Sequence, residues 1–177
     1  MRRLNIGKYV LHSLVVGGVL FVCGSVAAQD YSSGIRDPRN GRAFQTLLNA
    51  KIFNIGGVGW AMQITPEEEA FKILFQSGTS IKEFQRLVDQ ASPEGQLYAL
   101  FGLHLMAPDI FRTEAEKLKA DDGPPKREQK FTFIAKGQVR IADGCLIFTQ
   151  ARRKVIDQIA RGEFDTRFKW SSSLLTH

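Results

Sequence analysis

One stretch of the chain predicts a helix with apolar residues on nearly every side. Ser92-Pro93-Glu94 marks its start, because serine caps a helix end and proline suits the first helical position. The sequence then continues GQLYALFGLHLM. A helix that is apolar all round must be covered by neighbours on several sides. We therefore expect other helices to pack around this one.

Four further stretches place apolar residues at helical spacing. They are residues 42–50, 65–78, 80–91 and 107–120, and a C-terminal helix is expected over 151–161, with Gly162 as its stop. Glutamates three residues after Thr65 and Ser80, namely Glu68 and Glu83, predict capping boxes at two of these starts. The links between helices are short, which favours antiparallel or steeply crossed packing, and no fixed repeat period is found.

Residues 130–150, KFTFIAKGQVRIADGCLIFTQ, contain β-forming residues instead. They predict strands near 130–135 and 138–149, with Asp143-Gly144 as a hairpin turn. Residues 51–64 predict either an extended segment with a bulge or an irregular loop packed on the core. The expected fold is α+β and mainly α: a compact bundle of about four short helices, a small hairpin or meander and a C-terminal helix.

The remaining segments complete the predicted organisation. Residues 42–162 are expected to form one globular domain, preceded by a flexible segment over 29–41, which is rich in turn-forming residues. The tail over 163–177 has no helical periodicity and is expected to be loosely ordered, although Phe164, Phe168 and Trp170 offer apolar groups for docking.

Residues 1–28 have the pattern of a cleavable secretory signal peptide. Arg2, Arg3 and Lys8 precede the apolar run LVVGGVLFVC, and small residues follow up to Ala28. Cleavage before Gln29 would leave 149 of the 177 residues. The sequence therefore predicts a protein that works outside the cytoplasm, in the periplasm or beyond it.

Three other interpretations of these residues stay open. An uncleaved anchor would need roughly 20 apolar residues, which residues 9–28 reach only by including His12 and two serines. Lipidation at Cys23 would tie the protein to a membrane, but Phe21 and Val22 occupy positions where lipoprotein signals usually have small residues. Arg2-Arg3 also occurs in twin-arginine signals.

Removing the leader changes both charge and cysteine content. Three of the 24 basic residues and none of the 18 acidic residues lie in it, so the net charge falls from +6 to +3. This mixed charge argues against nucleic acid as a partner. Cys145 becomes the single thiol, so no internal disulfide can form, and only His104 and His177 remain as histidines. We expect no metal and no cofactor.

Two motifs contain residues that could support chemistry. Gly56-Gly57-Val58-Gly59 resembles a phosphate-cradling loop, but no Gly-Lys-Ser/Thr follows, so a turn with unusual backbone angles is favoured. Cys145 is a candidate nucleophile with His104 as its base. The neighbouring Leu146 and Ile147 instead favour a small, buried, apolar role for the thiol, and His104 is expected inside the core or facing a crevice.

The charged clusters have simpler interpretations. Glu67-Glu68-Glu69 and Asp121-Asp122 lack the spaced oxygen ligands of a calcium loop, so helix capping and solvation are expected for them. Arg152-Arg153-Lys154 is expected to be a solvated basic face, with contact to an anion or an acidic partner as the alternative.

The segment SPEGQLYALFGL over 92–103, followed later by Gly144-Cys145, resembles an uncharacterised family of exported bacterial proteins. The similarity spans roughly residues 58–162, and its motifs are apolar. It implies no activity. It implies only that Gly95, Gly102 and Cys145 serve the close packing of helices and strand.

The sequence thus predicts an exported, non-enzymatic protein that binds or shields another exported or envelope protein. A membrane partner is expected only if the leader is retained or Cys23 is lipidated. The alternative is a small thiol-dependent or other hydrolase that uses Cys145 and His104.

Overall fold

Helix α4 (Pro93–Met106) lies at the centre of the described fold, as its all-round apolar surface predicts. In a computed structural model of the chain, residues 37–122 and 137–173 are described, and they belong to one compact unit, Ser32–His177. Leu97 to Leu103 are buried without interruption along α4. The predicted leader over 1–28 lies outside the described residues.

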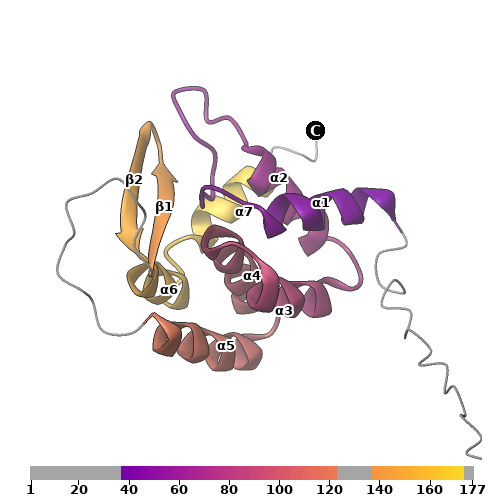
Figure 1. The fold of residues 1–177 in the computed structure, drawn as a ribbon. Coiled ribbons are helices and arrows are strands. Elements are labelled where there is room, and N and C mark those ends of the chain that lie inside the picture. Colours follow the sequence, from indigo (N-terminus) through magenta and orange to yellow (C-terminus); the bar gives the residue numbers. More distant parts are fainter. Residues whose placement is uncertain (1–36, 123–136, 174–177) are drawn as a thin grey trace, which may run out of the picture. The chain divides into compact units, whose positions relative to one another are not determined.

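Besides the C-terminal helix, whose Phe168 packs on Phe101 of α4, five helices contact α4 and bury it from several sides (Figure 1). They are α1 (Pro38–Leu48), α2 (Pro66–Phe75), α3 (Ser80–Gln90), α5 (Pro108–Asp121) and α6 (Arg152–Ala160). A further helix, α7 (Asp165–Ser173), follows α6. With one small hairpin, this arrangement confirms the predicted α+β, mainly helical fold class.

The helix starts follow the sequence signals with two corrections. Thr65 and Ser92 cap α2 and α4 with their side chains as predicted. Helix α1 begins at Pro38, not at residue 42, because Asp37 caps it by accepting a hydrogen bond from the Arg39 amide at 2.8 Å. Ser80 is the first residue of α3 and not its cap, and its Oγ donates to the Leu74 carbonyl at 2.7 Å.

The hairpin consists of β1 (Gln138–Asp143) and β2 (Leu146–Ala151). The strands pair antiparallel from Gln138 with Ala151 to Asp143 with Leu146, so the predicted turn at Asp143-Gly144 is confirmed. Gly144 has φ +57°, a backbone conformation that suits glycine. The strand predicted over 130–135 lies outside the described residues.

A buried ion pair holds the base of this hairpin. Arg152, only 5% exposed, bonds the Asp122 carboxylate with its guanidinium, and its amide donates to the Gly137 carbonyl at 2.8 Å. The interpretation of Asp122 and Arg152 as solvated charges was therefore wrong. Their pairing joins α5, the start of β1 and α6, which no local pattern indicates because the two residues are 30 positions apart.

The C-terminal tail also differs from its prediction. It contains α7, and Phe164 and Phe168 are buried at 7% and 8% exposure. Both rings pack edge-on against Phe101 of α4, with centroids 6.3 and 5.6 Å away. The globular fold therefore continues past Gly162 through these two phenylalanines. Gly162 itself ends α6 with φ +72°, as predicted.

The close packing expected at Gly95 and Gly102 is confirmed. A Cβ on Gly95 would lie 2.1 Å from the Leu47 carbonyl oxygen, and one on Gly102 would lie 2.4 Å from the Phe84 ring. These glycines admit the end of α1 and a side chain of α3 against α4. None of the helices in the described ranges has the length and apolar character required to cross a bilayer.

Candidate functional site

The segment between α1 and α2 runs beside β1 and reaches the hairpin turn. The Phe53 amide donates to the Arg140 carbonyl at 2.9 Å, and the Ala142 amide donates to the Phe53 carbonyl at 3.0 Å. Farther along, the Gly59 amide donates to the Gly144 carbonyl at 2.8 Å. The segment is therefore an irregular loop tied to the hairpin, one of the two alternatives predicted for it.

Glycine is required where this loop turns. Gly56 and Gly57 have φ values of +100° and +80°, as expected for a turn with unusual backbone angles. A Cβ on Gly57 would lie 2.5 Å from the Met62 carbonyl oxygen. The loop therefore folds back on itself so closely that a side chain is excluded.

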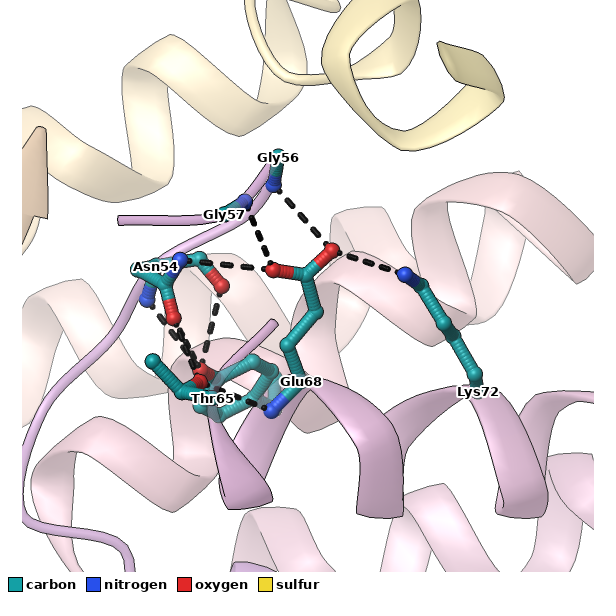
Figure 2. Close-up of polar contacts among 7 residues, drawn as sticks. Asn54, Gly56, Gly57, Thr65, Glu68 and Lys72 are labelled. Atoms are coloured by element: carbon teal, nitrogen blue, oxygen red, sulfur yellow. Dashed lines mark hydrogen bonds and ion pairs between the residues drawn. The ribbon is translucent and has the colours of Figure 1, made fainter. Parts of the chain in front are cut away.

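The glycine loop does cradle an anion, and that anion is the chain's own Glu68 carboxylate (Figure 2). This carboxylate accepts hydrogen bonds from the amides of Gly56 at 3.2 Å and Gly57 at 2.9 Å, and from Asn54 Nδ2 at 3.3 Å. Lys72, one helical turn along α2, completes an ion pair at 3.0 Å. Glu68 is fully buried, so the predictions of solvation and of a reciprocal capping box were wrong for it.

A second set of hydrogen bonds holds the start of the loop. The Tyr98 hydroxyl donates to the Asn54 carbonyl at 3.0 Å and accepts from the Asn54 amide at 3.1 Å. Thr65 Oγ1 donates to Asn54 Oδ1 at 2.7 Å. Burial raises the pKa of Tyr98 far above its ordinary value, so the phenol stays protonated. The loop is thus fixed to α2 and α4 by buried polar groups with matched partners.

The same loop and hairpin also carry exposed apolar side chains. Six large apolar side chains are exposed among the described residues, and five of them come from these two segments. We call these five the loop–hairpin patch: Trp60 (96% exposed), Met62 (42%), Leu146 (69%), Ile147 (69%) and Phe148 (39%). The hydrogen bond between Gly59 and Gly144 brings the two segments together.

A cleft of about 400 Å³ lies between the loop, the hairpin turn and α7. Residues 55–57, 62, 142–144, 166 and 167 line it. Its charged members are Asp143 and Arg167, which pair at 2.8 Å. The volume falls in the range of small-ligand pockets or of a recess for one or two side chains.

The two residues proposed for thiol chemistry have separate surroundings. Cys145 is exposed at the hairpin turn, so its predicted role as a buried packing residue was wrong. His104 is partly buried beside the rings of Phe101 and Phe111, and its Nε2 lies 3.4 Å from Asp165 Oδ1. These contacts join α4 to α5 and α7 and do not involve the thiol. Among the described residues, no three histidine, cysteine or acidic side chains gather to hold a metal.

Comparison with known proteins adds no assignment: no family model, curated protein or solved structure matches the chain. The similarity to exported bacterial proteins therefore stays a prediction.

Sequence reasoning located the glycine loop and the hairpin turn but missed the patch. In the sequence, Leu146 and Ile147 favour a buried environment for Cys145, whereas both side chains are exposed. One sequence signal could have indicated these exposed residues: an apolar run that directly follows a turn and contains no charged residue.

Proposed function

We propose that this chain is an exported, non-enzymatic protein-binding module, and that the loop–hairpin patch is its binding surface. The observation that carries the proposal is that five of the six large apolar side chains exposed in the described part of the chain lie on two hydrogen-bonded segments. Large apolar side chains left exposed on neighbouring segments of a domain often mark an interaction site.

The composition of the patch favours a protein partner. Aromatic residues and methionine are enriched in the buried centres of protein interfaces, and tryptophan is prominent among the residues that dominate binding energy. Trp60 is almost fully exposed. The cleft beside it offers a recess for an apolar side chain of the partner.

The fixed backbone beneath the patch supports the same proposal. The carboxylate of Glu68 and the hydroxyl of Tyr98 hold the base of the loop that carries Trp60. A surface that is ordered before binding loses less conformational entropy when the partner arrives.

Site-specific crosslinking tests the proposal. A photo-reactive amino acid is incorporated in place of Trp60 while the protein is expressed in its own cells. The matched control carries the same amino acid in place of Lys82, an exposed position on α3. We expect a discrete crosslinked product with another protein from position 60 only, and we expect Ile147→Ser to abolish that product. Equal products from both positions, or none from position 60 in folded protein, would overturn the proposal.

The exported part of the proposal has its own test. N-terminal sequencing of the protein recovered from outside the cytoplasm should begin at Gln29. Retention of Met1, or a lipid on Cys23, would instead tie the domain to a membrane.

A further inference from the structure

A second hollow of the fold lies between α1 and α2, and we call it the α1–α2 groove. Its volume is about 310 Å³, and its polar lining residues are Arg39, Arg42 and Thr46 of α1 and Glu69 of α2. None of its lining residues belongs to the loop–hairpin patch. The volume is at the lower end of the range for small-ligand pockets, so a ligand that fills the groove must be small.

The α1 wall of the groove carries two positive charges. Arg39 and Arg42 are exposed and lie three residues apart on the helix, so they are neighbours on one side of it. Each guanidinium presents a planar set of donors that matches the two oxygens of a carboxylate. This wall is therefore suited to hold a carboxylate.

The groove also offers acceptors to a cation. Glu69 is exposed on α2 and brings a carboxylate to the lining. Thr46 Oγ1 donates its one hydrogen to the Arg42 carbonyl at 3.0 Å, which leaves the oxygen of this hydroxyl as an acceptor. An ammonium group has three donors and no acceptor, so it matches these two side chains.

The opposite charges in this groove do not neutralise each other directly. Among the described residues, no ion pair joins Arg39 or Arg42 to Glu69. In the cleft beside the hairpin, by contrast, Asp143 and Arg167 pair at 2.8 Å. A ligand in the α1–α2 groove therefore meets both signs of charge without breaking an ion pair between them.

The remaining lining residues of the groove are apolar. Ala43 and Ala70 are buried, and Ile73 is half-buried. An apolar side chain of a ligand that lies against them is removed from water, which stabilises the complex. The groove thus combines a site for a carboxylate, a site for an ammonium group and an apolar surface.

We infer that the α1–α2 groove binds a small zwitterion: an amino acid or short peptide with free termini and an apolar side chain. Arg39 and Arg42 hold its carboxylate, and Glu69 accepts from its ammonium group. Glu69 disfavours a multiply charged anion such as phosphate, because like charges repel. The ligand is distinct from the protein partner proposed for the loop–hairpin patch, so either proposal can fail without the other.

Titration followed by nuclear magnetic resonance tests the inference. Leucine and alanyl-leucine are added separately to the isotope-labelled protein, and the amide signals of Ala43, Thr46 and Ala70 are recorded. We expect saturable shifts of these signals, and the probe with the lower Kd identifies a free amino acid or a peptide as the ligand.

Blocked probes show whether both charges of the ligand matter. N-acetyl-alanyl-leucine lacks the ammonium group, and alanyl-leucinamide lacks the carboxylate. Each should bind about tenfold more weakly than alanyl-leucine, or worse, because one charge-assisted contact is lost. This comparison uses the parent protein only, so no folding defect can imitate its result.

Substitutions assign the two charges to their residues. Arg42→Gln and Glu69→Gln should each raise the Kd for the tighter probe by about tenfold or more. Both positions are exposed, so the melting curve should stay as in the parent. Lys82→Gln removes an exposed charge from α3 and is the matched control, which should bind the probe as the parent does.

Three results would overturn the inference. They are the absence of saturable shifts with both probes, equal binding of the free and blocked dipeptides, and binding of inorganic phosphate as tight as that of the tighter probe. The last result would make the groove a simple anion site. None of them changes the crosslinking expected from Trp60, which tests the proposed function separately.

Discussion

The surroundings of α4 and the outer surface of the hairpin use apolar side chains in opposite ways. Around α4, Leu97 and Phe101 are sealed from water, and the buried carboxylate of Glu68 has matched partners. On the hairpin, Leu146 and Ile147 are 69% exposed. Burial at the first region stabilises the fold, whereas the second region leaves its apolar surface exposed to solvent, as the proposed binding role requires. Substitutions should therefore separate stability from binding.

Removal of Glu68 should have the largest effect. Glu68→Ala leaves the buried amides of Gly56 and Gly57 without their acceptor and takes the paired carboxylate from Lys72. Loss of one partner of a buried ion pair costs about 3–5 kcal/mol, and urea unfolding followed by circular dichroism measures it. The double variant Glu68→Met with Lys72→Met should recover part of this loss. A loss below about 1 kcal/mol for Glu68→Ala would contradict the network's role.

Gly95→Ala should cause the second-largest loss in the free energy of unfolding. Its Cβ would lie 2.1 Å from the backbone oxygen of Leu47, which cannot move without shifting the end of α1. Overpacking of this kind costs about 1–3 kcal/mol or more in unfolding free energy. Gly78→Ala is the matched control, because nothing lies within 4 Å of its Cβ position. Equal melting temperatures for the two variants would show that α1 and α4 do not pack this closely in solution.

Tyr98→Phe should cost about 1–3 kcal/mol, because it leaves the buried Asn54 amide without its acceptor. The variant should also change the pH dependence of stability. Burial raises the pKa of Tyr98 well above the ordinary value of about 10. Above that pH the unfolded chain releases this proton while the folded protein keeps it, so the free energy of unfolding falls as pH rises.

The measurement is urea unfolding between pH 8 and pH 11, a range chosen to span roughly the ordinary tyrosine pKa. The parent should lose more stability over this interval than Tyr98→Phe does. Parallel curves for the two proteins would mean that the phenol is not buried in solution.

Ile147→Ser should have the smallest effect on stability. An exposed position away from the core usually changes the unfolding free energy by less than about 0.5 kcal/mol. Ile156→Ser, at a fully buried position on α6, is the matched control and should cost several-fold more. Similar losses for the two isoleucines would place β2 in the core and would remove the distinction between the two regions.

The sequence predicted the parts of the fold that depend on local or all-round apolar patterns. α4 could be predicted because a helix without a polar face must be buried on all sides. The caps at Thr65 and Ser92 could be predicted because they depend only on neighbouring residues. Glu68 was missed because its ion pair with Lys72 has the spacing of an ordinary surface pair. Its glycine partners are 11 and 12 residues away and meet it only after folding.

The prediction of which apolar residues are exposed was wrong for a related reason. A run of apolar residues in a strand indicates burial only if both faces and both edges are covered, and the sequence does not show which edge is covered. Cys145 was therefore assigned to the interior on the strength of its apolar neighbours. α7 was missed because it has few apolar residues, although Phe164 and Phe168 are spaced by one helical turn.

The carboxylate of Glu68 has a consequence for the motions of the loop. The amide hydrogens of Gly56 and Gly57 are held by a group that belongs to α2 and is sealed from water. They can exchange with solvent deuterium only when the first turn of α2 separates from the loop. The base of the loop that carries Trp60 should therefore open to solvent no faster than the helical interior does.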